Sequence, residues 1–245
     1  CFYLVGGLVM LIANITNLPH AFALIFEGAF NPQAILGGAV GIGVREAMRY
    51  GVARGLFSNE AGMGSTPHAH AMAKVEKPQD QGVVAMVCVF IDTFVVLTIT
   101  ALVMITSGAL NVGDMAANPA AENMAQVAFS TVFGSFGNFY VAICLLFFAF
   151  STIIGWYFFA EQNVRFLFSE KALLPYRVIV CAFIIVGATL KVDLVWALAD
   201  LFNGLMVIPN LIALIALHKV VGNCLDDFEA KLAKYEKTQQ NISHS

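Results

Sequence analysis

Long apolar segments, separated by short polar ones, make up most of the 245-residue chain. An α-helix needs about 20 mostly apolar residues to cross the hydrocarbon core of a bilayer. This length predicts membrane spans at about 83–110, 136–163, 173–190 and 193–218, and residues 1–13 have the composition of the end of another span. The chain is therefore predicted to be an all-α integral membrane protein.

The segment over about 38–74 does not have the composition of an ordinary membrane helix. Its middle, residues 57–65, has the sequence FSNEAGMGS, which places glycines and polar side chains among apolar neighbours. Glycine readily leaves the helical conformation, and non-helical backbone at membrane depth is tolerated only where it is buried in protein or lines a cavity. The pattern predicts a membrane helix that is broken in its middle. Residues 18–30 are too short to cross, and we expect them to lie along the outer surface of the membrane.

Basic residues are distributed unevenly between the connecting segments. Three of these segments hold two or more each: Lys74 and Lys77; Arg165, Lys171 and Arg177; and Lys219, Lys231, Lys234 and Lys237, while the tight turn between the last two spans holds Lys191 alone. Residues 111–135 contain no lysine or arginine. With the predicted spans, the three basic segments fall on one side of the membrane, which the positive-inside rule identifies as cytoplasmic. We therefore expect a transmembrane domain over 1–218 and a cytoplasmic tail over 219–245.

The composition excludes several classes of protein. The chain is 59% apolar and 12% charged, about half the charge of a soluble domain, so membrane lipid is an expected partner. A net charge of −3 and the absence of a basic block argue against nucleic acid as a partner. Five cysteines without a Cys-x-x-Cys pair give no sign of a metal or redox cofactor. The chain opens on Cys1 inside an apolar run, so we expect it to be a fragment with an upstream portion.

A broken membrane helix offers two kinds of ligand. Carbonyl groups at the end of its first half can replace water around a small cation, and N–H groups at the start of its second half can hold a carboxylate. That combination suits a zwitterion that travels with sodium. The alternative is a glycine-rich kink kept for packing, but packing alone would not require Asn59 and Glu60 at hydrocarbon depth.

A second polar feature lies in the uncharged span over 136–163. Ser151 and Thr152 could give oxygen ligands to a hard monovalent ion, and Trp156 could form the wall of a pocket. The alternative is that both hydroxyl groups bond to carbonyls of their own helix. Weaker candidates, which more often serve as hydrogen-bond partners between helices, are Asp92, Thr93, Asp200 and Asn203. His68 and His70 would point to different sides of a helix, which disfavours a metal pair.

Residues 54–71, RGLFSNEAGMGSTPHAHA, resemble the signature of the alanine or glycine:cation symporters, SNEAG-x-GS-x-P followed by AHA. The flanking segments AFNPQAILGG (29–38) and FSTIIGWYFFAE (150–161) agree, and the resemblance covers most of 1–218. It implies the leucine-transporter-type fold, in which two inverted five-helix repeats each begin with a discontinuous helix. This chain would supply the C-terminal half of that fold, from the end of the fifth helix through helices six to ten.

The resemblance also implies a function and a site. The function is sodium-coupled symport of a small neutral amino acid, alanine or glycine, by alternating access across a bacterial plasma membrane, with Na⁺ as coupling ion. The residues facing the amino acid would be Phe57, Ser58, Asn59, Glu60, Ala61, Gly62, Thr152 and Trp156, and the sodium ligands Ser151 and Thr152. The sequence leaves open the preferred amino acid and the oligomeric state.

Three other functions compete with this interpretation. Polar residues of the break could line an ion or solute channel, although channels usually build pores from repeated subunits or re-entrant loops. A proton could replace sodium as the coupling ion. An intramembrane enzyme would need a nucleophile and a base, for which only Ser58 with His68 or His70 are available. Enzyme motifs are absent from the sequence, so we predict a protein that is not an enzyme.

Overall fold

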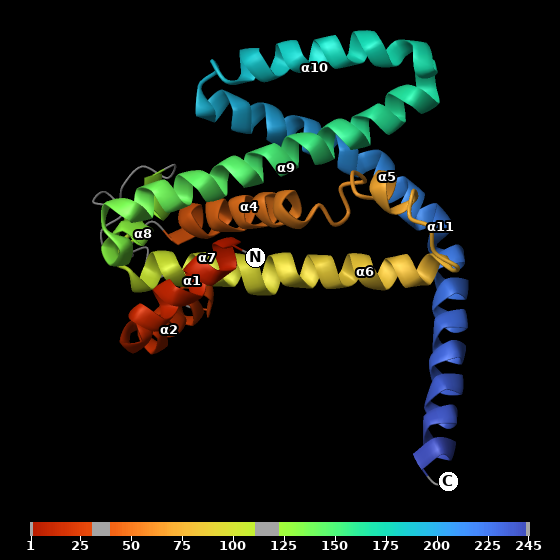
Figure 1. The fold of residues 1–245 in the computed structure, drawn as a ribbon, viewed down its shortest axis with the longest axis horizontal. Coiled ribbons are helices and arrows are strands. Elements are labelled where there is room, and N and C mark those ends of the chain that lie inside the picture. The colour runs from red at the N-terminus through yellow and green to blue at the C-terminus, as the bar shows by residue number, and fades with distance from the viewer. Residues whose placement is uncertain (1, 31–39, 111–122, 244–245) are drawn as a thin grey trace. The chain divides into compact units, whose positions relative to one another are not determined.

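The computed structural model of the chain describes residues 2–30, 40–110 and 123–243, and in these ranges every regular element is a helix (Figure 1). The all-α prediction is confirmed. The chain divides into two compact units. The first contains Cys1–Ser58 and Phe90–Trp156, and the second contains Asn59–Val89 and Tyr157–Ser245.

Several helices contribute to each unit. The elements of the first unit are α1 (Phe2–Ala13), α2 (Leu18–Phe30), α4 (Val40–Asn59), a π-helical segment (Ile91–Leu97), α7 (Thr98–Thr106), α8 (Met124–Phe133) and the first part of α9 (Ser135–Phe168). The elements of the second unit are α5 (Pro67–His70), α6 (Pro78–Phe90), the end of α9, α10 (Leu173–Gly187) and α11 (Val192–Ser243).

The core of the first unit forms where α1, α7, α8 and the start of α9 meet. Phe129 of α8 is fully buried, and its ring lies 5.6 Å from that of Tyr140, centroid to centroid. The Tyr140 hydroxyl donates a hydrogen bond of 2.6 Å to the backbone carbonyl of Phe2. Small residues allow this close packing: a Cβ at Gly137 would lie 2.6 Å from the carbonyl carbon of Phe129. The packing of α8 on α9 therefore depends on a glycine at this position.

Gly137→Ala is expected to lower the Tm of the detergent-solubilised protein by about 3–10 °C, because the added methyl group overlaps backbone atoms that cannot rotate away. The control is Gly222→Ala in α11, where no other atom lies within 4 Å of the added carbon. Alanine favours the helix over glycine by about 1 kcal/mol, so the control should keep or raise the Tm. A Tm that is unchanged by Gly137→Ala would contradict the close approach of α8 and α9.

Among the described residues, three helices have the length and composition to cross a membrane: Pro78–Thr106, Ser135–Phe168 and Val192–Tyr235. The bent pair Phe2–Ala13 and Ile15–Phe30, with 77° between its halves, would make a fourth if it counts as one span. In the most apolar windows of the three helices, 0%, 17% and 0% of the residues are buried inside the structure. Apolar side chains on the outside of long helices are the property of a multi-pass membrane protein.

Two helices differ from the expected spans. α10 has 15 residues and a length of about 22 Å, against the roughly 30 Å of a hydrocarbon core. Its crossing therefore stays a prediction. α11 has 52 residues and runs without interruption past residue 218, where we expected the span to end, to Ser243 (Figure 1). The residues beyond 218 are mostly good helix formers, with Gly222 as the one glycine, so nothing in them stops the helix.

Charged residues join the elements of the second unit. Glu161, near the end of α9, accepts a hydrogen bond of 3.1 Å from Arg165, and its carboxylate lies 3.5 Å from the guanidinium of Arg177 in α10. Lys77, just before α6, pairs with Asp227 of α11. These ion pairs connect α9 with α10 and the start of α6 with the distal part of α11.

Candidate functional site

The interruption expected from the sequence is present in the structure. α4 ends at Asn59, α5 begins at Pro67, and the backbone between them is not helical. Three residues of this segment have positive φ angles: Glu60 at 56°, Gly62 at 83° and Gly64 at 86°. Glycine adopts this conformation freely, whereas a glutamate does so at a cost in energy. We call residues 60–66 the break.

Side chains of the break hold its shape. The hydroxyl of Ser65 donates a hydrogen bond of 2.6 Å to the carboxylate of Glu60, and the backbone N–H of Ala61 donates one of 2.9 Å to the side-chain oxygen of Asn59. Ser65 is 2% exposed and Met63 is 1% exposed, so the middle of the break is packed against protein. Asn59 and Glu60 thus stabilise the non-helical backbone, which gives these polar side chains a structural role beside the predicted one.

The second half of the broken helix is shorter than expected. α5 consists of four residues, Pro67–His70. A single turn has a small dipole. The structure therefore gives no support to the expectation that a substrate carboxylate is held at the start of this helix. The end of α4, a 20-residue helix, keeps the negative end of a full helix dipole beside the break.

Asp92 is brought to the end of α4. The hydroxyl of Ser58 donates a hydrogen bond of 2.7 Å to the Asp92 carboxylate, and both residues belong to the first unit. Asp92 lies in the π-helical segment Ile91–Leu97, between α6 and α7. Such interruptions of an α-helix occur frequently at functional sites. The sequence placed Asp92 only among the weaker candidates, because its partnership with Ser58 depends on the packing of separate helices.

Asn210 of α11 also contacts the break, and the sequence did not identify it. Its amide nitrogen donates a hydrogen bond of 2.8 Å to the carbonyl oxygen of Gly62. A Cβ at Gly64 would lie 2.9 Å from the Cβ of Asn210. The candidates that the sequence offers on this helix are Asp200 and Asn203. The signal that could have been used is Pro209, the one proline inside α11 and the neighbour of Asn210.

The predicted substrate and sodium residues occupy three places in the chain. Phe57, Ser58 and Asn59 form the end of α4, Glu60, Ala61 and Gly62 begin the break, and Ser151, Thr152 and Trp156 lie in the middle of α9. The hydroxyl of Ser151 donates a hydrogen bond of 3.0 Å to the carbonyl of Phe148, one turn earlier. Ser151 and Thr152 belong to the first unit, and the break belongs to the second. Their roles as substrate and sodium ligands stay predictions.

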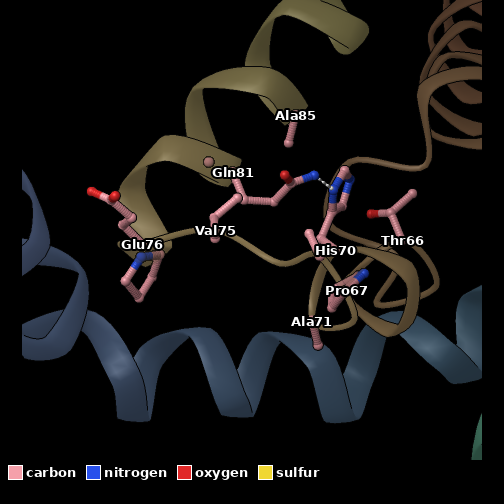
Figure 2. A pocket seen from close by; sticks show the side chains of 11 residues that line it. Thr66, Pro67, His70, Ala71, Val75, Glu76, Gln81 and Ala85 are labelled. Atoms are coloured by element: carbon pink, nitrogen blue, oxygen red, sulfur yellow. Dashed lines mark hydrogen bonds between the residues drawn. The ribbon is translucent and has the colours of Figure 1, made fainter.

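A cavity of about 740 Å³ lies beside α5 and the start of α6. Figure 2 shows the Gln81 side chain reaching His70 there, and their nitrogen atoms are 2.7 Å apart. His68 instead lies 3.2 Å from the amide nitrogen of Asn163 in α9. The two histidines point to different partners, as their spacing predicted. The predicted substrate and sodium residues do not line this cavity, which begins at Thr66.

Comparison with known proteins places the chain among transporters. The family model for the sodium:alanine symporters matches residues 1–242. A Haemophilus influenzae protein described as an uncharacterised transporter is 42% identical over 231 residues, which is 94% of this chain and 50% of that protein. The probable sodium/glutamine symporter GlnT of Bacillus subtilis is 41% identical, over 92% of this chain and 46% of its own length. The sodium/alanine symporter AgcS of Methanococcus maripaludis is also 41% identical, over 90% of this chain and 47% of its own length.

The chain thus spans about half the length of these curated relatives. The family model, in contrast, covers nearly all of the chain, including α4, the break and α11. Its members are transporters and not enzymes, which confirms the prediction that the protein is not an enzyme. The chain belongs to the sodium:alanine symporter family.

Proposed function

We propose that the whole protein is a sodium-coupled symporter of a small neutral amino acid, alanine or glycine. The observation that carries the proposal is the ordered break between α4 and α5, with its three positive φ angles and its polar side chains, in a chain of long apolar helices. We further propose the leucine-transporter-type inverted-repeat fold, a bacterial plasma membrane location, and a cytoplasmic side for the residues beyond 218. Transport then proceeds by alternating access to a site that includes the break.

In this mechanism the break and α9 have different tasks. The carbonyl groups at the end of α4 are not used by the next helical turn, and they carry the negative end of the helix dipole. A sodium ion or the ammonium group of an amino acid matches that charge. Phe57 and Trp156 supply aromatic surface that limits the volume for the substrate side chain. The hydroxyl groups of Ser151 and Thr152 are oxygen donors of the kind that hard cations prefer.

The test is uptake of labelled alanine into proteoliposomes that contain the full-length protein, with and without an inward sodium gradient. Asn59→Ala removes the acceptor of the Ala61 N–H, and Thr152→Ala removes the proposed sodium ligand. Each is expected to reduce sodium-driven uptake by about tenfold or more. The matched control is Thr189→Val, which removes a hydroxyl that bonds to the carbonyl of Val186 in its own turn. Uptake that ignores sodium, or that survives both substitutions, contradicts the proposal.

The same vesicles separate the alternatives. A symporter accumulates alanine against its own gradient when sodium is supplied, whereas a channel only equilibrates it. A pH gradient without sodium drives uptake if the coupling ion is a proton. Because the Bacillus subtilis relative is named as a probable glutamine symporter, unlabelled glycine and glutamine are added as competitors. Competition by glutamine stronger than by glycine would reject the proposed preference for a small side chain.

A further inference from the structure

The side chain of Asn210 links the middle of α11 to the break through a hydrogen bond to backbone. Its amide nitrogen lies 2.8 Å from the Gly62 carbonyl oxygen, and both residues belong to the second unit. Gly62 has a φ of 83°, so its carbonyl lies outside any helical hydrogen-bond ladder. A carbonyl outside a helical ladder is free to accept a donor from elsewhere in the protein, and this hydrogen bond is exposed in the structure. Asn210 supplies that donor.

Packing reinforces the hydrogen bond. The backbone at Gly64 approaches Asn210 so closely that a Cβ there would lie 2.9 Å from the Asn210 Cβ, 3.1 Å from its Cγ and 3.2 Å from its Oδ1. The two contacts lie on either side of Met63, which is 1% exposed. Gly62 and Gly64, both with left-handed backbone angles, therefore allow the break to contact the Asn210 side chain at two places.

The position of Asn210 within α11 adds a third observation. Pro209 has no N–H group, so the carbonyl of Leu205 loses its helical partner and α11 is easier to bend at this step. The contacts that Asn210 makes with the break therefore lie next to Pro209, where α11 lacks one helical hydrogen bond. Asn210 thus joins the break to α11 beside Pro209.

We propose that Asn210 is a positioning residue that ties the break to α11, so that the break and the Pro209 step move as one body during transport. The inference rests on the proposed symport function. Asn210 bonds the protein's own backbone and not the amino acid. Its loss should therefore slow the conformational step more than it weakens substrate binding.

The first readout is the kinetics of labelled alanine uptake by the full-length protein in proteoliposomes with a sodium gradient. Asn210→Leu keeps the approximate shape of the side chain and removes its donor. We expect the maximal rate to fall about fivefold or more, with a change in KM of less than about twofold. The control is Asn203→Leu, the same change two turns earlier on α11, which should leave both values within about twofold of the unsubstituted protein.

The second readout does not require transport. Met63→Cys is introduced into protein whose native cysteines are replaced by alanine, and labelling by a membrane-permeant thiol reagent is timed. The buried thiol is expected to react slowly, and at least about tenfold faster when Asn210→Leu is added, because the break is then released from α11. Unchanged labelling with Asn210→Leu overturns the inference, whatever happens to uptake. Absence of alanine uptake by the unsubstituted protein contradicts the proposed function instead, and leaves the labelling result to decide the role of Asn210.

Discussion

Gly64→Ala is expected to reduce sodium-driven alanine uptake by about 30-fold or more, whereas Gly62→Ala should reduce it by about tenfold. Both glycines have φ angles above 80°, and an alanine pays about 1–2 kcal/mol for that conformation. The two positions differ in their surroundings. A Cβ at Gly62 meets no atom within 4 Å, while one at Gly64 lies 2.9 Å from the Cβ of Asn210.

The alanine Cβ of Gly64→Ala would overlap the Cβ of Asn210 on α11. A Cβ is bonded directly to the backbone, so no side-chain rotation can move it away. The break or α11 must shift instead, and overpacking of this kind costs about 1–3 kcal/mol more. Each 1.4 kcal/mol corresponds to about a tenfold change in rate. The expected difference between the two variants is therefore at least about fivefold.

Initial uptake rates at equal amounts of reconstituted protein would measure this difference, with the Tm of each variant in detergent as a check on folding. The pair of glycines acts as its own control, because the backbone strain is nearly the same in both variants. Equal losses at Gly62 and Gly64 would show that strain alone matters and that the contact with Asn210 is not important for transport.

The interruption of α4 could be predicted because it depends on local chemistry. Glycines at positions 62 and 64 permit positive φ angles, and Asn59 and Ser65 bond to groups no more than five residues away. Short-range signals of this kind are visible in a single sequence. The start and end of the surface-helix candidate at 18–30 agree with α2 for the same reason, since Pro19 is tolerated in a first helical turn.

Contacts between distant segments could not be predicted. Ser58 and Asp92 are 34 residues apart, and Gly62 and Asn210 are 148 apart. Periodicity cannot say which helices pack together, so the sequence pointed to Asn203 and not to Asn210 on the same helix. The helix that contains the last predicted span also continues past residue 218, because a helix does not stop where its surroundings change from lipid to water. Residues 219–243 contain no proline, so no residue in them favours an end to the helix.

Ser58→Ala and Asp92→Ala are each expected to lower sodium-driven alanine uptake by about tenfold, and the double variant should be no worse than the more damaging single one. The hydroxyl of Ser58 donates to the Asp92 carboxylate over 2.7 Å, and hydrogen bonds to charged groups contribute about 1.5–3 kcal/mol. Removing either partner breaks the same contact, so the two losses should not add. Additive losses would mean that the residues act separately.

Asp92→Asn separates the hydrogen bond from the charge. The asparagine oxygen can still accept a hydrogen bond from Ser58, so uptake should fall by less than about threefold if the contact only fixes the end of α4 beside the π-helical segment. The half-saturating sodium concentration is measured in the same vesicles. If Asp92→Asn is as damaging as Asp92→Ala and raises that concentration, the negative charge itself is required. A carboxylate beside the end of α4, where the helix dipole is also negative, would then be part of the cation site.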